Sequence, residues 1–281
     1  MKILGFGDSI PEGVYRPHSV FRNSVNFRGP AGLVVSLVGR AAGNGPMNIV
    51  MERPPAGARR LEIRGSRFHI DENPLETGPG KKYDSSMPKI RSDRARLRRN
   101  LALLKKSGGS AVPEKSMWFL YDPRLETTFK SSFELRLLER MKDGFTLLLD
   151  GNYARGARAL RGLGFGLTPS GDDFLCGCLT GLGFIGANFP SDLSGLIGLL
   201  YRSAETENPV SATFAWCAYN GRVNEKVRRL LLALAGTDRT ELDASAAAVF
   251  RTGHTSGADF CAGLVFGCEL GLLTMETPRC S

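Results

Sequence analysis

The sequence predicts an α+β protein in which an N-terminal β-rich domain, of the barrel or sandwich kind, precedes a mostly α-helical domain. Before about residue 88, short runs of apolar and β-branched residues alternate with glycine- and proline-rich turn sequences. Beyond about residue 126, longer segments carry apolar residues at helical spacing. The helical part also contains one sequence motif twice, which predicts a two-helix repeat inside that domain.

The N-terminal part contains segments typical of strands, separated by sequences rich in Gly, Pro, Asn and Asp that favour turns. The three clearest segments are GLVVSLVG, MNIVME and RLEIRGSRFHI. Residues 74–88 hold three prolines and two glycines and are expected to form a linker. We therefore predict a β-rich domain over residues 1–88 and a helical domain over residues 89–281.

A basic segment, Lys89 to Lys106, opens the second domain. It has eight basic residues and one acidic residue, but no aromatic side chain on which a base could stack. Leu97, Leu101 and Leu104 recur at helical spacing, so we expect a helix with one face packed on the protein and the other solvated. The sequence therefore does not predict a nucleic-acid partner.

Five further segments are expected to be helices. In the first, Phe133, Leu137, Leu138 and Met141 form one apolar stripe. The other four each open on a polar residue, and three of them stop at a glycine. The five segments are SSFELRLLERMKDG, SDLSGLIGLLYRSAE, SATFAWCAYNG, NEKVRRLLLALAG and RTELDASAAAVFRTG.

Composition and charge narrow the class of protein. With 281 residues, 42% hydrophobic and 23% charged, the chain has the composition of a globular protein with a substantial core. The net charge of +9 favours acidic partners such as phosphates, carboxylates or nucleic acid, without choosing among them.

The chain reaches Gly5 and Asp8 too soon for a signal peptide, and the longest uncharged run, residues 174–190, is short of the roughly 20 residues of a membrane span. We expect a cytoplasmic protein without a membrane partner.

The cysteines predict neither a metal site nor a redox site. Five of the six lie among apolar residues, and no C-x-x-C pair exists. The C-x-C of Cys176 and Cys178 lacks a nearby histidine or second pair for zinc. Reduced, structural cysteines suit a cytosolic protein. We expect no metal and no cofactor.

The motif S-G-x-D-F-x-x-G-x-x-x-G occurs once at Ser170 and again at Ser256. In each copy the serine and the aspartate three residues later, Asp173 or Asp259, match the S-x-x-D capping box. A helix is therefore expected to begin at each serine and to be capped by its own aspartate. Glycines four residues apart lie on one helix face and allow close approach of another backbone. We expect the two helices to pack against each other through these glycines.

Three features near the repeat exceed what a helix cap needs. The first copy follows the glycine-rich sequence GLGFGLTP, whose free backbone N–H groups next to a helix start would suit an anion. Asp172 has no counterpart in the second copy, which has Ala258, and only the second copy has His254. Adjacent helical residues point about 100° apart, so Asp172 is expected to face away from Asp173 and not to share a metal with it.

These features predict a site where the two helix starts meet. Its candidate catalytic residues are Asp172 and His254. No metal is expected there. The candidate ligand-binding residues are Gly166, Thr168, Ser170, Gly171, Thr255, Ser256 and Asp259.

Two stretches, GLGFGLTPSGDDFLCG and GHTSGADFCAG, resemble the AllH-like family, a domain of unknown function whose namesake is a subunit of bacterial oxamate carbamoyltransferase. The segment HSVFRNSVNF, residues 18–27, is similar to an early strand of that family, so the resemblance spans most of the chain. Phe165 stands where a proline is expected, which is a mild departure. The resemblance implies an assembly of three different subunits in anaerobic allantoin catabolism, where oxalurate and phosphate exchange with oxamate and carbamoyl phosphate. It carries no catalytic residue onto this chain.

The candidate residues suit such substrates, which offer an anionic end and amide donors. Backbone N–H groups of residues 166–171 could hold the anion, and Asp172 could accept from the amide N–H. His254 could polarise the carbonyl or shuttle a proton, and direct carbamoyl transfer needs no covalent nucleophile. The chain is therefore interpreted as a carbamoyltransferase subunit that binds a small anionic, amide-bearing ligand beside other subunits. A non-catalytic scaffold or ligand-binding subunit is the alternative.

A less favoured alternative comes from ILGFGDSIPEG, which resembles the first block of the GDSL-type serine hydrolases with Ser9 as nucleophile. That family needs a histidine within a D-x-x-H sequence. None of the three histidines, His18, His69 and His254, has an aspartate three residues before it. A β-rich segment also follows where the hydrolase fold needs a helix, so the sequence disfavours the hydrolase.

Overall fold

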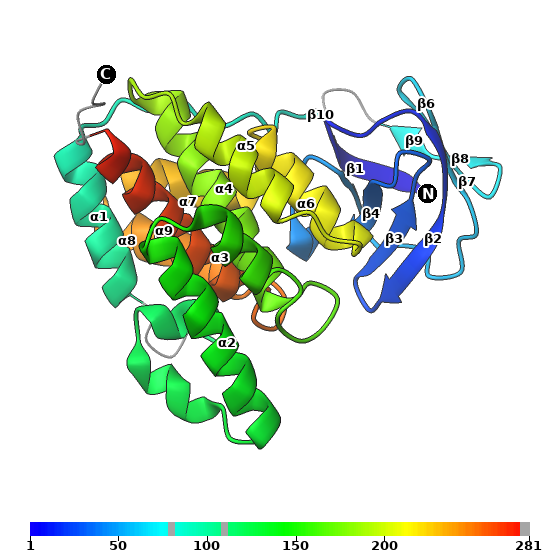
Figure 1. The fold of residues 1–281 in the computed structure, drawn as a ribbon. Helices are drawn as coiled ribbons and strands as arrows, with labels where there is room; N and C mark the ends of the chain where they lie inside the picture. The colour runs from blue at the N-terminus through cyan, green and yellow to red at the C-terminus, as the bar shows by residue number, and fades with distance from the viewer. Residues whose placement is uncertain (78–81, 108–111, 276–281) are drawn as a thin grey trace. The chain divides into compact units, whose positions relative to one another are not determined.

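The computed structural model describes residues 1–77, 82–107 and 112–275. The chain divides into two compact units, which are Met1–Ser86 with Arg222–Glu225, and Met87–Gly221 with Lys226–Ser281. Figure 1 shows strands in the first unit and helices in the second. The predicted α+β class, with a barrel-like N-terminal part followed by helices, is therefore confirmed.

The first unit is a nearly closed β-barrel. Its strands are β1 (Lys2–Gly7), β2 (Gly13–Phe21), β3 (Ser24–Arg28), β4 (Val34–Gly39), β5 (Asn48–Met51), β6 (Leu61–Arg64), β7 (Arg67–Ile70), β8 (Asn73–Pro74), β9 (Glu76–Thr77) and β10 (Lys82–Tyr83). They lie in the order β10-β1-β5-β4-β3-β2-β6-β7-β8, and β9 pairs with β1. The pairing of β4 with β5 is parallel, as is that of β1 with β9 and β10. Residues such as Ile3, Phe27 and Leu37 are fully buried and form the barrel core.

The predicted strand segments appear in this barrel. GLVVSLVG and MNIVME contain β4 and β5, and RLEIRGSRFHI contains the hairpin of β6 and β7. In β1, every second residue is buried, because successive side chains of a strand point to opposite faces of the sheet. A short 3-10 helix, η1 (Arg40–Ala42), follows β4.

The second unit is helical. Its α-helices are α1 (Arg94–Lys106), α2 (Ser132–Leu149), α3 (Tyr153–Leu160), α4 (Ser170–Asn188), α5 (Ser194–Ser203), α6 (Pro209–Tyr219), α7 (Glu225–Ala235, whose first residue belongs to the first unit), α8 (Arg239–Phe250) and α9 (Ser256–Thr274). Two 3-10 helices, η3 (Met117–Leu120) and η4 (Pro123–Thr128), lie between α1 and α2. The five predicted helical segments overlap α2, α5, α6, α7 and α8.

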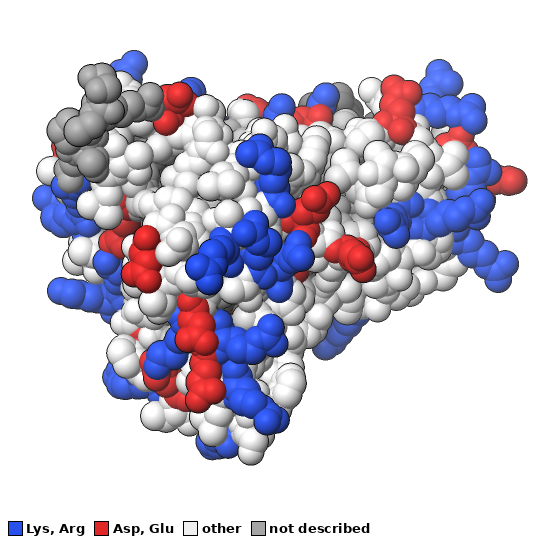
Figure 2. Space-filling model, in the orientation of Figure 1, with Lys and Arg blue, Asp and Glu red and all other residues white. Residues whose placement is uncertain are grey.

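The basic segment forms α1, and its Leu97, Leu101 and Leu104 are buried as predicted. On the face drawn in Figure 2, acidic side chains lie among the basic ones of the helical unit.

The helix α9 is long and apolar enough to pass a test for a membrane span, but 72% of its apolar window is buried inside the protein. Buried core helices pass the same test, so the result is weak support for a span.

The described cysteines are free and buried, in agreement with the structural role expected for them. They are Cys176, Cys178, Cys217, Cys261 and Cys268. Burial raises the pKa of the Cys178 thiol to about 12. Thiols in such an environment stay protonated and unreactive. The sixth cysteine, Cys280, lies outside the described residues.

The two repeat helices, α4 and α9, pack together through their glycines (Figure 1). A Cβ atom at Gly177 would lie 1.9 Å from the carbonyl oxygen of Phe260, and one at Gly263 would lie 1.8 Å from that of Phe174. The contact is reciprocal, since Phe174 and Phe260 occupy equivalent positions in the two motif copies. The predicted glycine-mediated packing is therefore confirmed, and no larger residue fits at these positions without moving a backbone.

The predicted capping boxes are wrong. The helices begin at the two serines, but the N-cap residues are Pro169 and Thr255, and neither makes a side-chain cap. The backbone N–H of Asp173 donates to the Pro169 carbonyl at 3.1 Å, and that of Asp259 donates to the Thr255 carbonyl at 3.0 Å. Each motif serine is thus the first helical residue instead of the N-cap, so its aspartate lies one position beyond the place that a capping box requires.

Candidate functional site

The glycine-rich lead, residues 162–169, folds tightly against the start of α4. Gly162, Gly164 and Gly166 have φ angles of 70°, 132° and 85°, which side-chain-bearing residues rarely adopt. A Cβ atom at Gly164 would lie 2.3 Å from the backbone nitrogen of Ser170. The glycines are therefore required for both the path of the lead and its close approach to the helix.

Hydrogen bonds hold the lead at several points. The Gly162 N–H donates to Asp172 Oδ1 at 2.7 Å, and the Gly171 N–H donates to the Leu163 carbonyl at 2.8 Å. At its other end, Asn208, the N-cap of α6, donates through Nδ2 to the Leu167 carbonyl. The lead is thus fixed to both α4 and the first turn of α6.

The lead leaves a run of backbone donors without partners. Within the described part of the chain, the N–H groups of residues 164–168 donate no hydrogen bond. Successive unpaired N–H groups beside a helix N-terminus favour a bound anion. The predicted donors from 166 to 171 need two corrections, because the Gly171 N–H is already bonded to Leu163 and Pro169 has no backbone N–H.

Asp172 is buried, with 4% of its surface exposed. Its Oδ1 accepts from Gly162, whereas its Oδ2 is buried and accepts no hydrogen bond from any described residue. Burial raises the pKa of Asp172, while the Gly162 N–H, the Ser211 side chain and the charge of Arg161 act in the opposite direction. The carboxyl therefore has one oxygen used by the fold and one without a partner.

His254 is exposed, at the end of the loop before α9. It makes no hydrogen bond or ion pair with Asp172 or with any other residue that the structure describes. The pairing of these two candidate catalytic residues therefore stays a prediction.

The two helix starts do meet at a pair of hydroxyl groups. Thr168 Oγ1 and Ser256 Oγ lie 2.8 Å apart, which joins the glycine lead of the first copy to the helix start of the second. The side chains of Ser256 and Thr168 interact with Asp173, and those of Ser170 and Thr255 interact with Asp259. Each aspartate thus faces the serine of the other repeat.

Asp173 and Asp259 form a buried carboxyl pair, whereas the sequence predicted two helix caps and, for Asp259, a candidate ligand-binding residue as well. Burial raises the pKa of Asp259 to about 6, although the Met117 N–H donates to its Oδ1 at 2.6 Å. Burial, and then the charge of Asp259, raise the pKa of Asp173 well above its usual value. For each, Oδ2 is buried and accepts no hydrogen bond from the described residues. Two aspartates at the same motif position could have suggested such a pair.

Metal ligation gains no support from this arrangement. Across the described ranges, no group of three or more His, Cys, Asp or Glu side chains is placed to hold a metal ion.

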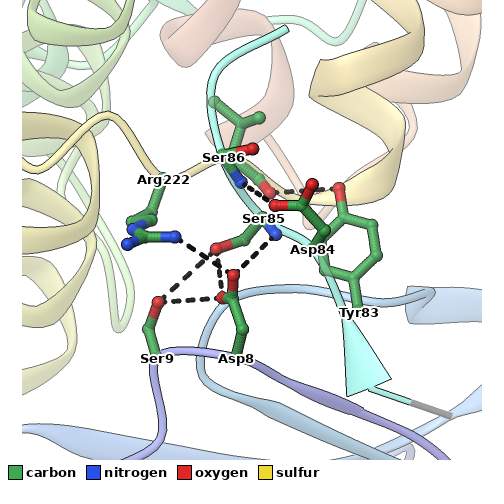
Figure 3. A network of polar contacts seen from close by, with 8 residues as sticks. Asp8, Ser9, Tyr83, Asp84, Ser85, Ser86 and Arg222 are labelled. Carbon is green, nitrogen blue, oxygen red and sulfur yellow. Dashed lines mark hydrogen bonds and ion pairs between the residues drawn. The ribbon is translucent and has the colours of Figure 1, made fainter. Parts of the chain in front are cut away.

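Ser9, the nucleophile of the hydrolase alternative, belongs to a polar network in the first unit (Figure 3). Its hydroxyl donates to Asp8 Oδ1 at 3.0 Å, and Asp8 also accepts from the Ser85 N–H and from Arg222 Nη1, both at 3.1 Å. The Ser85 hydroxyl donates to Asp8 as well. Among the described residues, no histidine contacts Ser9, so the network has the form of a structural ion pair rather than an activated nucleophile.

The fold and the site define an α+β protein whose helical unit carries a duplicated glycine-bearing helix motif. Residues 160–268 match the model of the family described as oxamate carbamoyltransferase subunit AllH. This match contains the glycine lead and both helix starts, and it confirms the resemblance for that part of the chain. No curated protein and no solved structure gave a match.

Proposed function

We propose that the chain is a cytoplasmic subunit of a carbamoyltransferase-type complex of allantoin catabolism, acting with other subunits on oxamate or oxalurate and carbamoyl phosphate. Its second unit binds a small, anionic, amide-bearing ligand at the junction of α4 and α9. The observation that carries the proposal is the family match over residues 160–268, because it coincides with the segment that holds the unpaired N–H groups and the buried carboxyls.

The chemistry of the residues supports this ligand class. The N–H groups of residues 164–168 bind the anionic end, as at other helix N-termini. A carboxylate such as that of Asp172 repels an anion bound beside it. The repulsion is offset when the same ligand has an amide N–H that donates a hydrogen bond to Asp172 Oδ2. Carbamoyl phosphate, oxamate and oxalurate meet that condition, whereas phosphate alone does not. Thr255 and Ser256 supply the opposite wall, and His254 polarises the carbonyl or moves a proton.

A non-catalytic ligand-binding or scaffold subunit is the second candidate. It is favoured by the structural use of Asp172 Oδ1 and by the exposure of His254, since neither is held as a general acid or base usually is. Activity after reconstitution separates the two candidates. Catalysis by this chain requires that His254→Ala lowers kcat, whereas a scaffold role requires that the complex tolerates the substitution.

The ligand is tested by titration calorimetry with the full chain and Asp172→Asn. Asparagine keeps an oxygen for the Gly162 N–H but replaces a charged acceptor with a neutral one. We expect Asp172→Asn to weaken binding of carbamoyl phosphate about tenfold and to leave phosphate binding unchanged or stronger. Equal carbamoyl phosphate affinities of the two proteins would contradict the amide role of Asp172.

A further inference from the structure

The half-buried side chain of Asn208 joins the start of α6 to the glycine-rich lead. Its Oδ1 accepts from the N–H groups of Val210 at 3.0 Å and Ser211 at 3.3 Å, which caps the helix. Its Nδ2 donates to the carbonyl of Leu167 in the lead. The orientation of this amide follows from its partners, because only the oxygen accepts from N–H groups and only the nitrogen donates to a carbonyl. Asn208 therefore uses both ends of its amide group at once.

The hydrogen bond to Leu167 falls where the lead has few others. The Leu163 carbonyl accepts a backbone hydrogen bond, and the next one along the lead, among the described residues, is the bond from Asn208 to Leu167. Residues 164–166 lie between these points, and two of the three are glycines with positive φ angles. Glycine has more conformational freedom than any other residue, so such a stretch depends on outside contacts to keep one conformation.

The segment before α6 contacts the lead at both ends. Arg161, which directly precedes the lead, donates through Nη1 to the Glu205 carbonyl at 3.0 Å. Three residues after Glu205, Asn208 binds the Leu167 carbonyl. Residues 205–208 therefore support the lead on either side of its run of free N–H groups.

The hydrogen bond from Asn208 also sets the direction of one of those free donors. The Leu167 carbonyl and the Thr168 N–H belong to the same planar peptide group, and in a trans peptide they point in opposite directions. The Thr168 N–H donates no hydrogen bond to any described residue. On the other side, Thr168 Oγ1 lies 2.8 Å from Ser256 Oγ. A donor held in place before its ligand arrives loses less conformational entropy on binding.

We propose that Asn208 is a positioning residue of the anion site, which holds the Leu167 carbonyl so that the Thr168 N–H keeps the orientation that binds the anion. This inference rests on the proposed function, in which the N–H groups of the lead bind the anionic end of the ligand. Asn208 acts through the lead and not on the ligand itself. It therefore affects every anionic ligand equally, whereas Asp172 distinguishes ligands by their amide.

Asn208→Ser separates the two uses of the side chain. Serine caps a helix about as well as asparagine and is also uncharged, but its single short hydroxyl cannot cap α6 and replace the amide that reaches Leu167. In titration calorimetry with the full chain, we expect Asn208→Ser to bind phosphate and carbamoyl phosphate each about tenfold more weakly than wild type. The ratio of the two affinities should not change. Hydrogen exchange of the Gly171 amide, which donates to the lead at Leu163, should become faster because the lead opens more easily.

Asp238→Ala is the matched control for helix capping. Asp238 caps α8 in the same unit by accepting from the N–H groups of Thr240 at 2.8 Å and Glu241 at 3.3 Å. This control should lower the unfolding temperature and leave phosphate affinity unchanged. Asn208→Ser should lower the unfolding temperature less than the control does, because it keeps its cap.

Equal phosphate affinity of wild type and Asn208→Ser overturns this inference alone. A loss of carbamoyl phosphate binding without a loss of phosphate binding overturns it too, because Asn208 would then act on the amide end of the ligand. Failure of wild type to bind either anion overturns the proposed function, and the role of Asn208 in binding with it.

Discussion

At the scale of residues, the carboxyl pair of Asp173 and Asp259 sets an energetic constraint at the centre of the repeat. Two buried carboxyl groups whose charges affect each other cannot both ionise without a large cost. The hydroxyl groups of Ser170 and Ser256 partly offset this cost by interacting with the aspartate of the other repeat. The pair therefore retains a proton at a pH where ordinary aspartates have lost theirs.

This retained proton predicts a pH-dependent stability. The pKa of Asp259 in the folded chain is about 6, against 3.8 for an ordinary aspartate, so the folded state binds the proton more tightly than the unfolded chain does. The bound proton stabilises the folded state fully when the pH is below the pKa of Asp259 in the unfolded chain. This stabilisation is lost as the pH rises through about 6, the pKa in the folded chain. Asp259→Asn keeps the acceptor for the Met117 N–H and removes the charge, so at pH 7 to 8 it should be more stable than wild type by on the order of 2 kcal/mol.

Urea denaturation at pH 4 to 8 measures this effect. Asp143→Asn, at an exposed position of α2, is the control and should follow the wild-type pH profile. A gap between wild type and Asp259→Asn that stays constant across this range would show that the Asp259 proton does not control stability.

At the scale of elements, the contact between α4 and α9 depends on glycine. Gly177 and Gly263 each lie against a backbone carbonyl oxygen of the other helix, and Gly181 and Gly267 repeat the contact one turn further along. A backbone carbonyl cannot rotate away as a side chain can, so an added methyl group must separate the helices. Because the same contact positions both helix starts, it also controls the geometry of the site.

We therefore predict that Gly177→Ala and Gly263→Ala each lower the free energy of unfolding by about 3 kcal/mol or more. Gly195→Ala in α5 is the matched control, because no described atom lies within 4 Å of a Cβ at that position. That substitution should be neutral or stabilising by up to about 1 kcal/mol, as expected from helix propensity. Similar stabilities of the three variants in chemical denaturation would contradict the role of glycine packing.

At the scale of the whole molecule, the first unit is assembled from two separate parts of the chain. Residues 222–225 belong to the same unit as residues 1–86, which contain the barrel. Arg222 pairs with Asp8, the Val223 N–H donates to the Ser85 carbonyl at 2.8 Å, and the Glu225 N–H donates to the Asn44 carbonyl at 2.9 Å. The first unit therefore includes a segment that follows residues 87–221 in the chain, although all its strands lie before residue 84.

Breaking the ion pair between Arg222 and Asp8 should loosen residues 222–225 from the rest of the first unit. Although burial acts to raise it, hydrogen bonds from Ser85 and Ser9 and the charge of Arg222 hold the pKa of Asp8 below its usual value. We predict that Arg222→Ala speeds hydrogen exchange of the Val223 and Glu225 amides by about tenfold, because local opening becomes easier. Arg40→Ala, which removes an exposed pair with Glu52, should leave those amides unchanged. Equal exchange in both variants would show that the Asp8 network does not hold the segment.

The sequence by itself determined the features that depend on neighbouring residues. Strand alternation, helical spacing and turn residues predict the α+β class, and the glycines of the repeat predict that α4 and α9 touch. Each of these patterns depends on residues that are close in the sequence, and the repeat is one such pattern that occurs twice. They can therefore be recognised from the sequence alone. The same locality explains why Gly162 and Gly166, with their positive φ angles, were recognisable as part of an unusual loop.

Only the tertiary structure decided which polar side chains face each other. The motif predicts self-capping, but the N-cap residues are Pro169 and Thr255, and Asp173 and Asp259 each face the serine of the other repeat. Ser211 lies in an ordinary helical segment, with no spacing that links it to Asp172. The packing of α6 on α4 brings these two side chains together, and packing of this kind depends on the shapes of whole helices rather than on any short run of residues.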